Sequence, residues 1–245
     1  MEKNMKKVLM ITGGWTGHEP VQQATRFSRI LREEGYEVDV FDNYDVLLDI
    51  NKLREYDLFV PFCTMDKLPE GATGNISTVI GEGMGLAGNH GGMCDAFRTN
   101  TEWQFICGGQ WVSHPGGFVT YKVDVIPGAN PLTEGIDSFE VTSEQYYVHV
   151  DPAIEVLATT RFPNPQAPYY HIANKPVDLP VMWTKFWGLG RVFYLSVGHQ
   201  DSVFDEAPEA QELMKRGLIW AAGGREYAAE KGLTVDRFLT DKKNF

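Results

Sequence analysis

The chain has 245 residues, of which 43% are hydrophobic and 12% aromatic, enough to bury the core of a globular protein. Its 33 acidic and 22 basic side chains give a net charge of −11, which repels phosphate backbones and anionic lipid surfaces. Composition and charge therefore argue against nucleic-acid and membrane partners and are compatible with a neutral small molecule such as a sugar.

Cysteine content and apolar segments limit the class of protein further. Cys63, Cys94 and Cys107 show no C-x-x-C spacing, so we expect neither a disulfide framework nor a thiolate zinc site. No segment approaches the ~20 apolar residues of a membrane span. The apolar run Val8–Ile11 behind the N-terminal lysines is too short for a signal peptide, so we expect a cytoplasmic location, with a trimmed precursor left open.

The first half of the chain alternates between apolar strand patterns and amphipathic helix patterns. The pattern KKVLMITGG (6–14) ends in a glycine turn, and apolar residues at helical spacing follow it up to Gly35. We expect strands at 6–14, 36–41, 57–62 and one ending in GLAGNH (85–90), with helices at 20–34, 46–56 and 95–107. This alternation predicts an α/β fold with a doubly wound, mostly parallel sheet.

The second half is rich in strand patterns and contains little helix until its end. Pieces separated by Pro, Gly and Asn lie at 117–128, 139–147 and 153–162 and predict an antiparallel or mixed β excursion. A hairpin joined by Gly-Leu-Gly is expected over 178–199, with its second arm ending at His199, and helices are expected at 208–222 and 235–239. We find no repeat or linker and therefore expect a single domain over residues 1–245.

Candidate polar residues follow the predicted carboxyl ends of the strands, where open α/β sheets bind ligands. They are His18 after the first strand, Cys63 and Asp66 after the third, His90 after the fourth, His199 and Asp201 after the last, and His114, Glu144, Gln145, Tyr146 and His149 on the connections between. The pattern predicts that five of the six histidines gather at one rim of the sheet.

Structural roles compete with this interpretation. His18 can cap the helix that begins near Pro20, and His90 can satisfy backbone groups at a tight turn, although its flanking glycines leave space around the ring. His149 also fits a half-buried strand position, and His171 fits a structural or surface role.

Cys94 is a competing nucleophile, because a cysteine at a helix N-terminus has a lowered thiol pKa. It lies a full turn past His90, inside the expected helix, which argues against that role. Cys63 and Cys107 lie in or beside apolar runs and are expected to be buried small side chains.

Two stretches carry a family resemblance. With GLAGNHGG (85–92) and GRVFYLSVGHQD (190–201), the chain resembles the class I glutamine amidotransferase-like superfamily, whose pattern is a G-x-C-x-G elbow and a late H-x-E. In this sequence His90 stands at the position of the elbow cysteine, and Asp201 stands at the position of the acid beside His199. Glutaminase chemistry needs a thiolate to form a thioester, so an amidotransferase activity is not expected.

Within that superfamily the chain is similar to the ThuA, or trehalose-utilisation, family over nearly its whole length. The resemblance rests on the first Gly-Gly turn with His18, the elbow, GGQWVSHPGG (108–117), TSEQYYVHVDP (142–152) and the late hairpin. The family's first loop often carries two histidines, whereas this chain has Trp15 and His18. The resemblance implies a flavodoxin-like fold and a role in the catabolism of disaccharides or oxidised sugars.

These residues suggest a metal-assisted or acid–base chemistry on sugars. The expected metal ligands are His90, His114, His199 and Glu144, the catalytic groups His90, His199, Asp201 and Glu144, and the substrate contacts Trp15, His18, Trp111, Gln145 and Tyr146, with Tyr147 as a further aromatic face. Neutral imidazoles and a carboxylate suit zinc and also manganese, iron or nickel, which polarise a carbonyl or activate water. Without metal, His199 oriented by Asp201 is the expected base.

The leading hypothesis is therefore a sugar-active hydrolase, lyase or isomerase with no nucleotide cofactor. A non-catalytic carbohydrate-binding or regulatory module that kept the pocket is the alternative, and a Cys94 hydrolase is a third. Aromatic-rich surface strands are compatible with a homodimer.

Overall fold

The computed structural model describes residues 5–165 and 175–237, so His171 and the last residues of the helix expected at 235–239 lie outside the described part. Within it the strands are β1 (Lys7–Thr12), β2 (Glu37–Phe41), β3 (Leu58–Phe62), β4 (Gly85–Asn89), β5 (Gly109–Ser113), β6 (Phe118–Val125), β7 (Phe139–Glu144), β8 (Tyr147–Val150), β9 (Glu155–Phe162), β10 (Val177–Trp187) and β11 (Gly190–Leu195). The α-helices are α1 (Pro20–Glu33), α2 (Ile50–Leu53), α3 (Ala72–Gly81), α4 (His90–Cys94), α5 (Thr101–Cys107), α6 (Val203–Glu206), α7 (Pro208–Ala221) and α8 (Gly224–Glu230). Short 3₁₀ turns are η1 (Thr16–His18), η2 (Asp45–Leu48), η3 (Pro131–Thr133) and η5 (Val235–Arg237).

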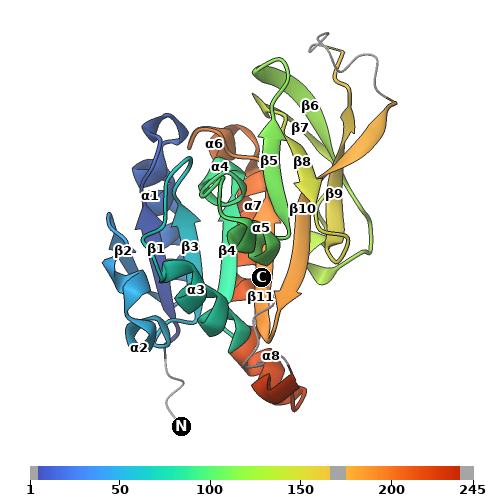
Figure 1. Cartoon of the computed structure of the whole chain (residues 1–245). Helices are drawn as coiled ribbons and strands as arrows, with labels where there is room; N and C mark the ends of the chain where they lie inside the picture. Colours follow the sequence, from blue (N-terminus) through green and yellow to red (C-terminus); the bar gives the residue numbers. More distant parts are fainter. Residues whose placement is uncertain (1–4, 166–174, 238–245) are drawn as a thin grey trace.

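One large sheet runs through the described residues in the order β2-β1-β3-β4-β11-β10-β9-β6-β7 (Figure 1). The pairs from β2 to β11 are parallel, and the pairs from β11 to β7 are antiparallel. Strands β5 and β8 form a separate antiparallel pair. The prediction of a doubly wound, mostly parallel α/β sheet with an antiparallel excursion is confirmed.

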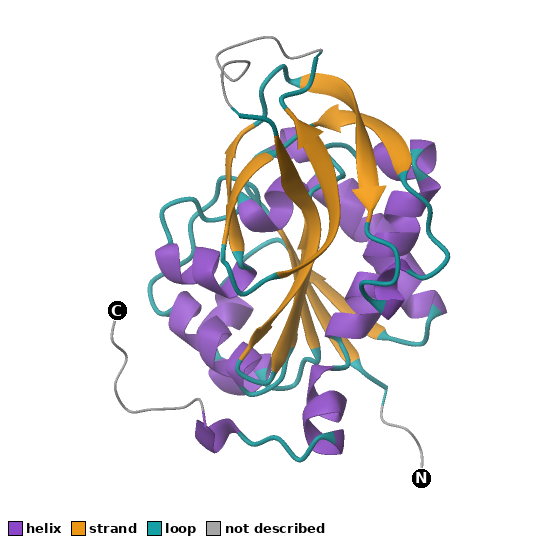
Figure 2. Cartoon of the chain, turned by 90° about the vertical axis from the view of Figure 1, so that its right-hand side faces the viewer, coloured by secondary structure: helices purple, strands orange, loops and turns teal. Residues whose placement is uncertain are grey.

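Strand β1 shows why the sheet is covered on both faces. Its Val8 and Met10 pack in one apolar cluster with residues of α1 and α7, while Leu9 and Ile11 pack in a second cluster with residues of α2, α3 and α5. Because the run Val8–Ile11 is apolar at every position, both faces of the strand must be buried, and helices on both sides of the sheet cover them (Figure 2).

Two predicted helices are interrupted. The expected helix at 46–56 is the turn η2 followed by α2, because Asp49 adopts an extended conformation and its side chain accepts hydrogen bonds from the first backbone N–H groups of α2. The expected helix at 95–107 is also wrong in its first half. There α4 begins at His90 and ends at Cys94, and α5 starts afresh after Asn100, whose side chain caps it.

The hairpin β10–β11 is confirmed, but β11 ends at Leu195 rather than at His199. Residues 196–199 leave the sheet as a loop, and α7 follows close to the predicted bounds. The sequence patterns missed α3, β5, α6 and α8, and the last expected helix is a 3₁₀ turn as far as it is described.

The parallel half places four connections at one edge of the sheet. The loops after β1, β3, β4 and β11 all leave the carboxyl ends of adjacent strands, and they carry His18, Thr64, His90 and His199. Within the described residues, no helix is both long enough and apolar enough to cross a membrane.

Candidate metal centre

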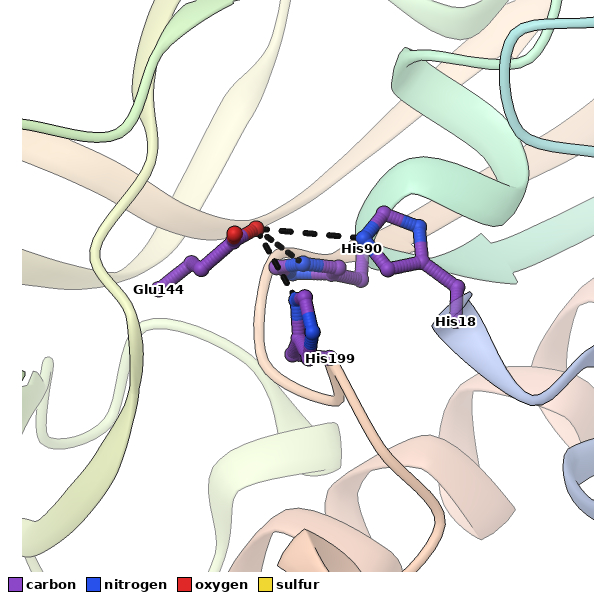
Figure 3. Close-up of side chains that lie close together, drawn as sticks. All are labelled: His18, His90, Glu144 and His199. Atoms are coloured by element: carbon purple, nitrogen blue, oxygen red, sulfur yellow. Dashed lines mark hydrogen bonds and ion pairs between the residues drawn. The ribbon is translucent and has the colours of Figure 1, made fainter. Parts of the chain in front are cut away.

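Four side chains meet at this edge of the sheet: His18, His90, Glu144 and His199 (Figure 3). One ligand atom from each lies within 4.8 Å of the others, and all four residues are buried. Three of them come from loops of the parallel half, whereas Glu144 is the last residue of β7 in the antiparallel half. The site therefore takes its side chains from both halves of the sheet.

His90 occupies the elbow between β4 and α4. Its φ of 45° is in the left-handed region, which non-glycine residues seldom adopt, and this turn directs the ring into the cluster. A Cβ on the next residue, Gly91, would lie 2.5 Å from ring atoms of His18, so glycine there lets the two imidazoles approach. Tyr146 stacks on the His90 ring at 3.9 Å between ring centroids, and the Tyr194 hydroxyl donates to the His90 carbonyl.

The hydrogen bonds of His90 fix its tautomer. Its Nδ1 lies 2.7 Å from the carbonyl oxygen of Ser196, which can only accept, so Nδ1 carries the proton. Burial lowers the pKa of His90 to about 3, so the ring is neutral near pH 7. It follows that Nε2 has a free lone pair, and this lone pair faces the Glu144 Oε2 atom at 3.2 Å.

Glu144 brings a negative charge to the same point. Burial alone would raise the pKa of Glu144, but its contacts with the neighbouring imidazoles, that of His18 first, outweigh burial and hold the pKa well below its usual range. Its Oε2 atom lies 3.0 Å from His199 Nδ1 and 3.8 Å from His18 Nε2. The contact with His199 is short but not aligned as a hydrogen bond, so His199 Nδ1 is a buried nitrogen with no hydrogen-bond partner among the described residues.

His18 completes the cluster from the turn η1. Its Nδ1 lies 2.8 Å from the Thr64 hydroxyl, which orients the ring so that Nε2 points towards Glu144. Burial lowers the pKa of His18 and favours the neutral ring. His18 is therefore a candidate metal ligand. Its role is not limited to capping a helix or contacting a substrate.

The donor set fits a divalent transition metal. Metal–nitrogen and metal–oxygen bonds of about 2.0–2.2 Å place two ligands of one ion about 3–4 Å apart. The distances from Glu144 Oε2 to the three imidazole nitrogens, 3.0, 3.2 and 3.8 Å, fall in this range. A free lone pair on His90 and an orphaned nitrogen on His199 both face the carboxylate, an arrangement that a cation between them would stabilise.

His114 lies beside the four-residue set and not within it. Its Nδ1 is 3.5 Å from the other carboxylate oxygen of Glu144, and its side chain is 38% exposed. The buried four-residue cluster contains His18, which the expected ligand set of His90, His114, His199 and Glu144 did not include, and it does not contain His114. His114 Nδ1 is a buried nitrogen with no hydrogen-bond partner among the described residues.

Asp201 does not contact His199. Its carboxylate makes a bidentate ion pair with Arg26, with N–O distances of 2.8 and 2.9 Å, and Arg26 also pairs with Asp205. The carboxylate that contacts His199 belongs to Glu144. The expectation that Asp201 orients His199 is therefore wrong, because the loop after β11 turns Asp201 towards α1.

The aromatic residues that were expected to contact a substrate differ in how exposed they are to solvent. Trp15 is 45% exposed, with its ring centroid 4.7 Å from that of His18, so it has an open face beside the cluster. Trp111 is half-buried under the Arg98 guanidinium, 4.3 Å from the ring centroid. Tyr146 is 2% exposed and stacked on His90, so it supports that ring and has no face open to a substrate.

Two further expectations are corrected. Gln145 is buried, and its side chain donates to the Thr160 hydroxyl and the Arg161 carbonyl on β9. His149 is exposed on β8 and its ring neighbour is Tyr147, so four histidines gather at the rim and not five.

The cysteines are all buried. Cys63 and Cys107 are fully covered, as expected of small apolar side chains. Burial also raises the pKa of the Cys94 thiol well above its ordinary value, which disfavours the thiolate that a cysteine hydrolase would need.

Sequence reasoning missed Phe118 and Gln23. Phe118 is 51% exposed, and its ring centroid lies 4.6 Å from that of His199. An aromatic residue directly after the glycines of PGGF was the available signal. Gln23 lies on the buried face of α1, where a polar side chain in an apolar helical pattern was the signal.

The fold and the elbow define a flavodoxin-like α/β protein in which a histidine occupies the nucleophile turn. The model of the ThuA family, described as trehalose utilisation, matches residues 7–221, and the chain belongs to this family. A search of the curated proteins finds no sequence match.

Solved structures support the fold. A ThuA-like protein from Parabacteroides merdae has a TM-score of 0.71 and 20% identity, covering 91% of each chain. One from Bacteroides uniformis has a TM-score of 0.69 and 20% identity, covering 91% of this chain and 94% of the other. A protein from Salmonella typhimurium that is described as cytoplasmic has a TM-score of 0.58 and 15% identity, covering 90% of this chain and 98% of the other. At these identities the likeness establishes the fold alone.

Proposed function

We propose that this ThuA protein is an enzyme of sugar catabolism that acts on a disaccharide or keto-sugar derivative at a divalent transition metal. The metal would be held by His18, His90, Glu144 and His199. The observation that carries the proposal is the convergence of three buried imidazoles within 3.8 Å of one carboxylate oxygen of Glu144, with His90 Nδ1 turned to the Ser196 carbonyl and His90 Nε2 turned to that oxygen. Such an ion supplies a Lewis acid that polarises a sugar carbonyl or lowers the pKa of water, in a hydrolase, lyase or isomerase reaction.

The side chains around the cluster supply the binding surface of this proposal. Trp15 and Phe118 are exposed, and each ring makes an edge-on contact with His199, at 6.0 and 4.6 Å between ring centroids. Flat aromatic faces suit the apolar C–H surface of a sugar ring. The partly exposed imidazole of His114, beside Glu144, would hydrogen-bond a sugar hydroxyl.

The proposal is tested by turnover of 3-keto-disaccharides. We expect the wild-type protein to lose turnover on chelation and to regain it with one of zinc, manganese, iron or nickel. The variant His90→Ala should lose at least ~100-fold in kcat/KM, because it removes a metal ligand. His149→Ala removes a histidine outside the cluster and is the matched control, with turnover within about twofold of wild type.

Unchanged turnover in His90→Ala would contradict the proposal. A rise in melting temperature on adding the sugar, without turnover under any metal, would support the non-catalytic binding module instead.

A further inference from the structure

Gln23 makes an unusual set of hydrogen bonds beneath the metal-binding loops. It lies on α1 and is 3% exposed. Its Nε2 donates to the carbonyl of His18 at 2.8 Å and to the carbonyl of Gly198 at 2.9 Å. Because carbonyl oxygens only accept, the nitrogen of the amide must face them, and both of its hydrogens are used.

The other end of the amide reaches the elbow. Gln23 Oε1 accepts a hydrogen bond from Asn89 Nδ2 at 2.8 Å, and Asn89 is 1% exposed. Asn89 directly precedes His90, and Gly198 directly precedes His199. One side chain therefore binds His18 itself and the residues next to the other two histidines of the cluster.

Gln23 bonds to all three segments, whereas the His90 Nδ1–Ser196 contact and the longer contacts of Asn89 Nδ2 with the Val197 and Gly198 carbonyls link only two of them. The segments follow β1, β4 and β11 and are far apart in sequence. The contact is also tightly packed: Gly198 has a φ of 115°, and a Cβ there would lie 2.5 Å from Asn89 Nδ2. A shift of one loop would therefore strain the bonds that hold Gln23 to the other two.

We propose that Gln23 is a positioning residue that sets His18, His90 and His199 at the spacing a metal ion requires. This inference rests on the proposed metal centre. Gln23 itself is not a ligand and touches no reacting atom. A glutamate would keep the oxygen that accepts from Asn89 but would lose both donors, and a methionine would keep the length of the side chain but lose all three hydrogen bonds.

The test is Co²⁺ binding, measured by competition with a chelator and by the visible absorption spectrum of the bound ion. We expect Gln23→Met to weaken Co²⁺ affinity by about 10- to 100-fold and to alter the spectrum, because outer-shell partners of metal ligands carry effects of this size. Gln23→Glu should change the Co²⁺ affinity and the spectrum in the same direction as Gln23→Met. It replaces the methionine variant in the test if that variant does not fold. Gln22→Met, an exposed neighbour on the same helix, should stay within about twofold of wild type.

A second control separates positioning from general loss of stability. Leu31→Ala truncates a fully buried side chain two turns further along α1 and should lower the melting temperature without changing the Co²⁺ spectrum. Unchanged affinity and spectrum in both Gln23 variants would overturn the inference, as would an equal loss of affinity in Leu31→Ala. A wild-type protein that binds neither Co²⁺ nor Zn²⁺ would instead overturn the metal centre.

Discussion

His90 shows how a buried imidazole is prepared for a metal. The Ser196 carbonyl holds the proton on Nδ1, and burial keeps the ring neutral, so the lone pair of Nε2 is available towards Glu144. While the ring is neutral, its single N–H proton is directed at Ser196, so Nε2 has no proton to donate to the carboxylate. The two groups are thus both prepared as ligands.

This state of His90 predicts how stability depends on pH. The folded-state pKa of about 3 lies below the ordinary value of 6.5, so between these values the unfolded chain binds a proton that the folded chain does not. Stability must therefore fall as the pH falls through this window, and Glu144, whose pKa is also lowered, acts in the same direction at lower pH. We expect metal-free protein to lose about 2 kcal/mol between pH 7 and pH 5 from His90 alone.

Urea unfolding at the two pH values, in chelator, measures this difference. His90→Gln should show a shallower pH dependence than wild type, and His149→Ala should match wild type. Equal slopes in wild type and His90→Gln would show that His90 is not held neutral.

At the scale of the secondary-structure elements, helix α1 and the residue before it hold a loop of the site in place. Glu19, Gln23 and Arg26 each hold the segment that follows β11: Glu19 accepts from the Asp201 backbone N–H, Gln23 donates to Gly198, and Arg26 pairs with the Asp201 carboxylate. Asp201 is therefore an anchor of the loop that carries His199 and does not act on the imidazole directly.

The Arg26–Asp201 pair makes a separate prediction. Asp201→Asn should lower kcat/KM only severalfold, whereas loss of an acid that orients a catalytic histidine costs about 10⁴-fold. Arg26→Gln should have a similar effect, and the double variant should be no worse than either single variant, because the two side chains form one contact. A four-order loss in Asp201→Asn alone would contradict this assignment.

Regular patterns of apolar residues predicted most of the helices and strands. Specific side chains explain where these predictions were wrong. Strand β1 and helix α1 follow from continuous apolar and helical patterns. The break at Asp49 depends on a capping bond that competes with the helical pattern around it. Glu144 was expected in the site and lies there, although it ends β7, which is far from β4 and β11 in the order of the sheet. Asp201 was misassigned because spacing from His199 does not show which way a loop turns.

At the scale of the whole molecule, the metal centre would join the two halves of the sheet. His18, His90 and His199 come from the parallel half, whereas Glu144 ends β7, a strand of the antiparallel half (Figure 1). An ion bound by all four would tie these halves together, and binding to the folded state alone would stabilise it.

Metal should therefore raise the melting temperature of the wild-type protein. At a metal concentration 100 times Kd we expect about 2.7 kcal/mol, or a rise of roughly 5–10 °C for a chain of this size. Glu144→Gln should show a much smaller rise, because the amide is a weaker ligand and carries no charge. An equal rise in Glu144→Gln would place the bound metal elsewhere.

The most direct test of the metal centre is elemental analysis of protein purified without chelators and without a histidine tag. We predict about one equivalent of a transition metal in wild type and in His149→Ala, and less than a tenth of that in His90→Ala and Glu144→Ala. Metal-free wild-type protein that stays metal-free after incubation with zinc, manganese, iron and nickel would contradict the account, as would full metal content in both cluster variants.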